Sequence, residues 1–230
     1  MLVETMTPGE LSLEIFAELK VLDITKERLM LEYDRERRRL KVGKEKDYIK
    51  TYPIKTKKKN TWLIFMLKHP AEEKYKGIGS IATFRLVYYY NARGLRVFEP
   101  YEKTRLSVYN GHLYKRYNER MGLGLSCPLE IVKHFHINNQ AKGIRIISSE
   151  GKDHLVAVCR DGLLLGEFQE GNAWEVYKTF VTREDLSTSL EETERDLIND
   201  LLDEINEAVT KYDYNPEEYK SLKRILKELK

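Results

Sequence analysis

Apolar residues recur every three or four positions near the start of the chain, which is the spacing of a helix with one buried face. The first such stripe predicts a helix over residues 9–22 and consists of Leu11, Ile15, Leu19 and Leu22. A second, charge-rich stripe predicts a separate helix over about residues 25–41, with Thr25 as the candidate N-cap and Gly43 as the stop. The chain is therefore expected to begin with two helices.

From about residue 48 the pattern changes to short apolar runs bounded by turn residues, and these predict strands. Five strands are expected before the middle of the chain, at residues 48–54, 61–67, 81–90, 95–98 and 104–109. Pro53 cannot donate a backbone hydrogen bond, so the first strand belongs at the edge of a sheet. Turn sequences at residues 57–60 and 91–94 predict hairpins, and this half is expected to be an antiparallel meander.

Two helices and a second group of strands follow. The helices are predicted over residues 112–121 and 128–137, and Pro128 suits the first position of the second helix. The strands are predicted at residues 144–148, 154–159, 163–168 and 174–182, with a tight turn at Asp161-Gly162. Apolar spacing predicts two more helices, over residues 190–210 and from Pro216 on.

These elements predict an α+β fold, with antiparallel sheets in two meanders flanking a central helix pair and with helical N- and C-terminal segments. No internal repeat and no Gly-, Ser- or Pro-rich linker divides the chain. We therefore expect a single α+β unit over residues 1–230. Its candidate subdivisions are residues 1–110, 111–186 and 187–230.

The composition, with 41% hydrophobic and 33% charged residues, is that of a soluble globular protein. The longest apolar run, Trp62 to Leu67, is far shorter than the roughly 20 residues of a membrane span, and the N-terminus lacks the pattern of a secretory signal. Cys127 and Cys159 form neither a CxxC motif nor a disulfide framework. These features predict a cytoplasmic location and no membrane partner.

Charge is distributed unevenly although the net charge is only +3. Residues 1–60 contain fifteen Lys and Arg against eleven Asp and Glu, whereas residues 183–230 contain eight against fourteen. A basic body with an acidic C-terminal segment could bind a polyanion such as RNA, or the two parts could attract each other.

The predicted helix over residues 112–121 is the chemically richest stretch. One face of it holds His112, Arg116, Glu119 and Arg120 at helical spacing. Arginine binds phosphate, and a histidine or carboxylate can transfer a proton near neutral pH, so these groups suffice for metal-independent RNA cleavage. His112 or Glu119 would then be catalytic, and Arg116 and Arg120 would bind phosphate. The alternative is a solvated helix face on which Glu119 pairs with Arg116 or Lys115.

His134 and His136, on the next predicted helix, are secondary candidates. With His112 they could suggest a zinc site, because imidazole is a common zinc ligand. Residues two apart on a helix point in different directions, however, and no cysteine or carboxylate lies at a diagnostic spacing. We therefore expect no metal and no cofactor. The alternative is a histidine whose hydrogen bonds are satisfied within the fold, or one whose charged form the C-terminus of the helix favours.

Tyrosines crowd into the centre of the chain, above all at Tyr88-Tyr89-Tyr90, with Arg85, Arg93, Arg96 and Arg105 nearby. Tyrosine and arginine on the face of a sheet can stack on single-stranded bases. The alternative is the ordinary preference of tyrosine for strands.

Residues 112–182 resemble the small ribonuclease-toxin superfamily that includes RelE-like and barnase-like folds. The resemblance lies in a His-x-x-x-Arg-x-x-x-Arg pattern, here His112, Arg116 and Arg120, followed by strands that look like a curved meander. It implies an RNA-directed, metal-independent endoribonuclease core, with Thr179 or Thr182 on the closing strand. The chain departs from that pattern in its long N-terminal part and its acidic C-terminal segment. From the contrast in charge, we expect the acidic helix predicted over residues 190–210 to cover the basic site and restrain it.

A rival hypothesis comes from another class of protein. The chain could be a non-enzymatic binding protein, of the kind encoded by a mobile element or phage, whose sheet and long helices dock a protein partner or mediate self-association. Such a protein would bind nucleic acid at most, without turnover.

Overall fold

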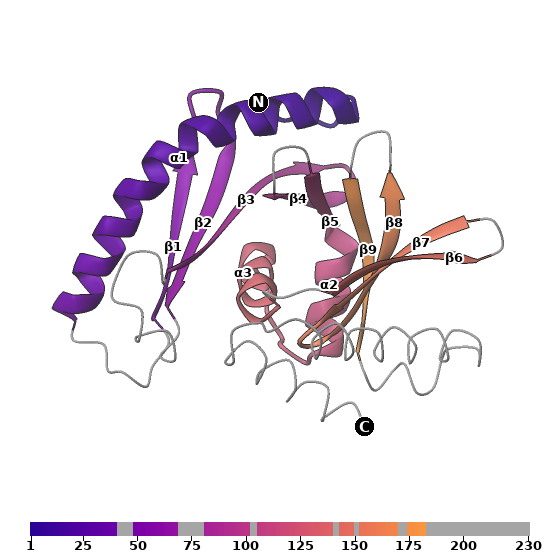
Figure 1. Cartoon of the computed structure of the whole chain (residues 1–230). Coiled ribbons are helices and arrows are strands. Elements are labelled where there is room, and N and C mark those ends of the chain that lie inside the picture. Colours follow the sequence, from indigo (N-terminus) through magenta and orange to yellow (C-terminus); the bar gives the residue numbers. More distant parts are fainter. Residues whose placement is uncertain are drawn as a thin grey trace, which may run out of the picture. The chain divides into compact units, whose positions relative to one another are not determined.

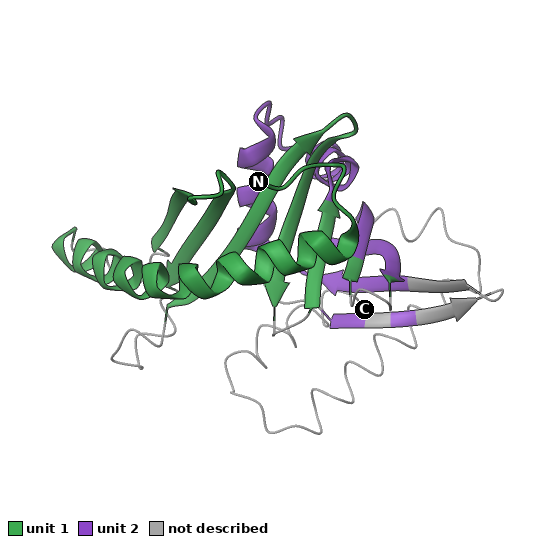
Figure 2. Ribbon diagram, turned by 90° about the horizontal axis from the view of Figure 1, so that it is seen from above, with its two compact units in different colours: residues 1–109, 169–175 green, residues 110–168, 176–230 purple. Residues whose placement is uncertain are grey.

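The structure of the protein is a computed structural model that describes residues 1–40, 48–68, 81–101, 105–139, 143–149, 152–169 and 174–182. The fold is α+β, as the sequence predicts (Figure 1). The chain divides into two compact units (Figure 2), unit 1 with residues 1–109 and 169–175 and unit 2 with residues 110–168 and 176–230. The predicted helices over residues 190–210 and from Pro216 on lie outside the described residues.

Unit 1 begins with one long helix, α1 (Pro8–Arg39). The prediction of two helices with a new start at Thr25 is wrong, because neither Gly nor Pro interrupts residues 10–39. The true start signal precedes the helix. The Glu10 backbone N–H donates to the Thr7 hydroxyl at 3.3 Å, and the Thr7 N–H donates to the Glu10 carboxylate at 2.7 Å, which is a capping box.

The strands of unit 1 lie in the order in which they occur along the chain. They are β1 (Tyr48–Lys55), β2 (Thr61–Lys68), β3 (Ala82–Asn91), β4 (Gly94–Tyr101) and β5 (Arg105–Asn110). Neighbouring strands from β1 to β4 are antiparallel, and β1 is the edge strand, as Pro53 predicts. A two-residue turn joins β3 to β4, and Gly94 after it has a φ of 107°, a conformation that favours glycine.

Helix α1 lies along one face of the strands of unit 1. Strand β2 is buried from Trp62 to Lys68, which explains why its sequence is continuously apolar rather than alternating. Side chains of α1 pack against residues of β1 and β2 to form a core cluster, whose buried members are Leu29, Tyr33, Tyr52, Ile64, Met66 and Ile81.

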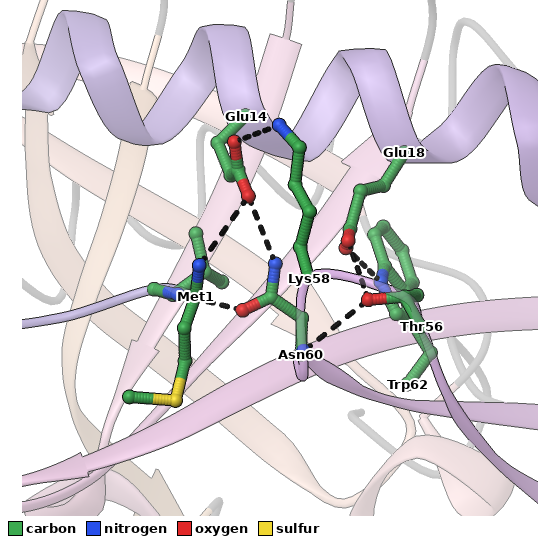
Figure 3. Close-up of polar contacts among 8 residues, drawn as sticks. Met1, Glu14, Glu18, Thr56, Lys58, Asn60 and Trp62 are labelled. Atoms are coloured by element: carbon green, nitrogen blue, oxygen red, sulfur yellow. Dashed lines mark hydrogen bonds and ion pairs between the residues drawn. The ribbon is translucent and has the colours of Figure 1, made fainter.

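Polar contacts fasten α1 to the turn between β1 and β2 (Figure 3). The Glu18 carboxylate, 6% exposed, accepts hydrogen bonds from the Trp62 indole at 2.8 Å and from the Thr56 hydroxyl. One turn earlier, the Glu14 carboxylate contacts the Lys58 ammonium and accepts from the Asn60 amide at 3.2 Å. The hydrogen bond from Lys58 lowers the pKa of Glu14 below its usual value.

A late segment of the chain completes unit 1. Strand β9 (Trp174–Thr182) contributes its first two residues to this unit. The Trp174 indole donates to the Ser12 hydroxyl at 2.8 Å, across 162 positions of sequence, and the buried Glu175 carboxylate accepts from the Ser107 hydroxyl at 3.0 Å.

The described residues of unit 2 form two helices and the later strands. These are α2 (Gly111–Arg120), α3 (Pro128–Asn138), β6 (Gly143–Ser149), β7 (Lys152–Cys159), β8 (Gly162–Gln169) and β9 from Val176 on. The strand order in this unit is β9-β8-β7-β6, and β8, β7 and β6 are antiparallel neighbours. None of the described helices is long and apolar enough to cross a membrane.

The β7–β8 turn differs by one residue from its prediction. Cys159 pairs with Gly162, so the two turn residues are Arg160 and Asp161 rather than Asp161 and Gly162. Gly162 has a different role. A Cβ atom there would lie 2.2 Å from the backbone oxygen of Val181, so only glycine permits the close approach of β8 to β9.

Candidate nucleic-acid interface

Helix α2 presents a polar row to solvent, as its sequence predicts. Leu113, Tyr114 and Tyr117 are buried and anchor the helix in unit 2. The opposite side carries the exposed side chains of the α2 row, which we define as His112, Lys115, Arg116, Glu119 and Arg120. The row is cationic, because three Lys and Arg residues stand against one carboxylate.

Arg116 lies at the centre of the α2 row. Its Nη1 atom is 3.2 Å from Oε2 of Glu119, and its Nε atom is 3.5 Å from Nε2 of His112. Lys115 approaches the other oxygen of Glu119, at 3.9 Å. Glu119 is thus held between two cations, which is the arrangement of the solvated-face alternative. His112 accepts the long contact from Arg116 only as a neutral ring with its proton on Nδ1.

Arg120 takes part in the fold as well as in the row. Its guanidinium donates to the backbone oxygen of Phe180 on β9, and the Tyr117 and Phe180 rings meet edge to face with centroids 5.0 Å apart. Arg120 therefore joins α2 to β9, although its side chain remains exposed. Arg116 is the other predicted phosphate ligand. Its described hydrogen bonds go to the side chains of His112 and Glu119 and not to a backbone oxygen.

The secondary candidates occupy three different settings. His136 is 2% exposed, and its Nε2 atom lies 2.9 Å from the Tyr114 hydroxyl, so it is part of the core. Thr179 is half-buried on β9. His134 is half-buried on α3, with its Nδ1 atom 2.9 Å from the Tyr117 hydroxyl.

A partly buried polar network surrounds Tyr117 and is not predicted by any pattern in the sequence. The Tyr117 hydroxyl donates to the Asp161 carboxylate at 2.6 Å, and the Asn139 amide donates to the same oxygen at 2.8 Å. Because a phenol has only one proton, His134 must donate to Tyr117 through its Nδ1 atom. Burial, followed by the hydrogen bond to Asp161, raises the pKa of Tyr117. The sequence predicts a turn at Asp161. No pattern in the sequence indicates that this turn lies beside Tyr117.

A second basic surface lies at one end of the strands of unit 1. Lys57 and Lys59 in the β1–β2 turn and Arg93 in the β3–β4 turn are exposed there. The register of β2 and β3 pairs Thr61 with Tyr88, which brings the two turns to the same end. A shallow recess of about 330 Å³ lies between the N-terminus, the β1–β2 turn and β3.

Of the three consecutive tyrosines on β3, two face away from α1. Tyr90 is 57% exposed, and its ring meets that of Tyr88 edge to face with centroids 6.1 Å apart. Tyr89 is buried and stacks on Phe98. Tyr88 and Tyr90 both line the recess, so aromatic rings and lysines occur together on this surface.

Among the described residues, no group of three or more His, Cys, Asp or Glu side chains is arranged to hold a metal ion. No known protein family matches the chain, and neither curated proteins nor solved structures give a match.

Proposed function

We propose that this protein binds RNA and that the α2 row contacts the phosphate backbone. The observation on which the proposal depends is the exposure of Lys115 and Arg116 on a row with a cationic excess. Guanidinium groups bind phosphate through two parallel hydrogen bonds, and neutralisation of phosphates provides most of the affinity of non-specific nucleic-acid binding.

The basic end of unit 1 supports single-stranded RNA as the ligand. Lys57, Lys59 and Arg93 offer charge, and the rings of Tyr88 and Tyr90 offer surfaces on which unpaired bases can stack. Stacking of this kind is favourable for every base and requires that the bases are not already paired.

Cleavage of the bound RNA is a second candidate function, favoured by the contact between His112 and Arg116. In this reaction Arg116 turns from His112 to the phosphate, and the freed Nε2 of His112 takes the proton of a 2′-hydroxyl as its oxygen attacks the adjacent phosphorus. The bond to the 5′-oxygen breaks, and this oxygen takes a proton from water. Glu119 is less suited to this role because two cations already hold it. The resemblance to RelE-like and barnase-like domains and a cytoplasmic location belong to the same proposal.

The binding proposal is tested with a fluorescent single-stranded oligoribonucleotide and its duplex, titrated at about 50 and about 200 mM salt. We expect the Lys115→Ala/Arg116→Ala variant to bind more weakly and to lower the salt slope by about 2, or about 1 for each lost phosphate contact. The matched control is Lys133→Ala on α3, whose ammonium pairs with Glu130. An unchanged affinity and salt slope in the double variant would overturn the proposal.

Cleavage is tested on the same oligoribonucleotide, without divalent ions, by following 2′,3′-cyclic phosphate ends. Turnover that disappears in His112→Ala while binding persists would assign His112 as the catalytic residue. Binding without turnover in the unchanged protein would restrict the function to RNA binding, and turnover that survives in His112→Ala would contradict the catalytic assignment.

A further inference from the structure

Helix α1 is apolar on two sides. Its inner side is buried against the strands of unit 1, as described above. Its outer side carries four large apolar side chains with high exposure: Leu13 at 74%, Val21 at 68%, Ile24 at 77% and Leu31 at 45%. Seen from above in Figure 2, none of the described strands or helices of unit 1 lies over this side of α1. A soluble helix normally exposes polar residues there, and contiguous exposed apolar residues mark an interaction site.

The exposed residues follow the spacing of a coiled coil. The positions Ala17, Val21, Ile24, Arg28 and Leu31 are separated by four, three, four and three residues, which is the alternation of a and d positions in a heptad. Leu13 is exposed beside this row, one residue before Glu14, through which the alternation continues to Glu10. We call these six residues, all exposed, the outer stripe of α1. At 1.5 Å per residue the stripe extends over about 27 Å.

We propose that two copies of this chain associate through the outer stripes of their α1 helices, packed antiparallel. The stripe pairs well with itself in this direction, because Val21 then packs beside Ile24 of the partner subunit around a two-fold axis. The small side chain of Ala17 leaves room for the aliphatic part of Arg28 of the partner subunit.

Charge at the two ends of the stripe selects the antiparallel direction. Glu10 and Arg35 continue the same row by one heptad at either end, and both are exposed. In an antiparallel pair, Glu10 faces Arg35 of the partner subunit at both ends. A parallel pair would instead place Glu10, Arg28 and Arg35 each beside its own copy, with like charges in contact.

The fold leaves this face available without rearrangement. Glu18, which accepts from Trp62 and Thr56, follows Ala17 by one residue and so lies about 100° around the helix from the outer stripe. Glu14, which contacts Lys58, lies on the flank of the helix between the outer stripe and the strands. The pairing helix is therefore already formed and oriented, so association does not require ordering of the segment. Because the contact consists of one stripe per subunit, we expect a dissociation constant on the order of micromolar.

The first experiment measures the mass of the full-length protein by light scattering over a range of concentrations up to about 100 μM, well above the micromolar dissociation constant expected for an interface of this size. We expect a dimer that dissociates on dilution, and a monomer at every concentration for Val21→Asp/Ile24→Asp. Both side chains are exposed, so the variant should keep the far-ultraviolet circular dichroism of the unchanged protein. The control is Glu27→Ala, at an exposed position of α1 outside the stripe, which should dimerise normally.

Two results would overturn the proposal. One is a dimer that persists in the double variant, since another surface would then be responsible. The other is a full-length protein that stays monomeric at the highest concentration, since the stripe would then be covered by something else, such as residues 183–230 of the same chain.

The direction of pairing is tested by disulfide cross-linking in a Cys127→Ser background, in which the remaining cysteine, Cys159, is buried. A mixture of differently tagged Val21→Cys and Ile24→Cys chains should form the mixed disulfide in preference to either homodimer. Predominant Val21→Cys homodimers would indicate a parallel pair and contradict the proposed register. Neither result depends on RNA, so the proposal can fail without affecting the proposed function.

Discussion

Two glutamates of this protein, Glu18 on the inner side of α1 and Glu119 in the α2 row, each have two hydrogen-bonding or charged partners. They differ in burial. Glu18 is buried and accepts from Trp62 and Thr56. The Glu119 side chain is 44% exposed and lies between Arg116 and Lys115. A buried acceptor that loses its partners leaves donors unsatisfied, whereas an exposed pair can exchange its contacts for water. The number of partners is therefore a poor guide to the role of a charged residue, and its burial is a better one.

The largest effect on stability is expected from Glu18→Ala. The substitution leaves the buried Trp62 indole without its acceptor and opens a small cavity, so the free energy of unfolding should fall by about 3 kcal/mol. Glu18→Gln keeps a carbonyl oxygen near the indole and should lower it by only about 1 kcal/mol. Urea denaturation measures both. Equal effects of the two variants would show that the charge, and not the acceptor, matters.

Tyr117→Phe tests the buried network of unit 2 and should have a smaller effect. It removes the donor to Asp161 and the acceptor for His134, while the Asn139 amide still donates to Asp161. We expect a loss of about 1–2 kcal/mol in urea denaturation. The exposed Tyr90→Phe is the matched control and should change stability by less than about 0.5 kcal/mol. A loss in the control as large as that of Tyr117→Phe would contradict the assignment.

Lys58→Ala should lower stability less than Tyr117→Phe does, because the Lys58 side chain is 53% exposed and its ion pair is screened by water. Its pH dependence is more informative. Since Lys58 lowers the pKa of Glu14 in the folded protein, the pair stabilises the fold above the pKa of the unfolded carboxyl group. This contribution disappears as the pH falls through the lower, folded value. Unfolding curves of the variant and the unchanged protein should therefore differ at pH 7 and coincide in acid, and a difference that grows in acid would contradict this.

The smallest effect on stability is expected from a substitution in the exposed α2 row. Arg116→Ala should change the free energy of unfolding by less than about 0.5 kcal/mol. Arg120→Ala is expected to be the more destabilising of the two because Arg120 also donates to the Phe180 backbone oxygen. The comparison of the two variants by urea denaturation separates the solvated member of the row from the member that supports the fold. The reverse order of effects would contradict this assignment.

Much of the secondary structure was predictable because local patterns determine it. The strands at residues 61–67 and 174–182 and the helix beginning at Pro128 agree with β2, β9 and α3 to within a residue at each end. The predicted break in α1 is wrong because Thr25, although a residue type that often caps helices, lies inside a segment without Gly or Pro and continues the helix. The Thr7-x-x-Glu10 signature, which decides where the helix begins, was overlooked.

The site was less predictable because burial depends on contacts between distant residues. The shared face of His112, Arg116 and Glu119 follows from helix geometry and was expected. The burial of His136 agrees with the alternative of a histidine satisfied within the fold, but the sequence alone does not indicate which of His134 and His136 is buried. The same limit applies to the outer stripe of α1, whose apolar residues look like core residues until the structure shows them exposed.

The contribution of β9 to unit 1 has a consequence for the order in which the protein folds during synthesis. Trp174 and Glu175 complete unit 1 by contacts with Ser12 and Ser107, and residues 110–168 leave the ribosome before them. The first 109 residues therefore lack these contacts while about half of unit 2 is translated. Contacts of such long sequence separation slow folding, and at about 5–20 residues per second the delay lasts several seconds. During that time the strands of unit 1 and the apolar stripe of α1 are both exposed to neighbouring chains.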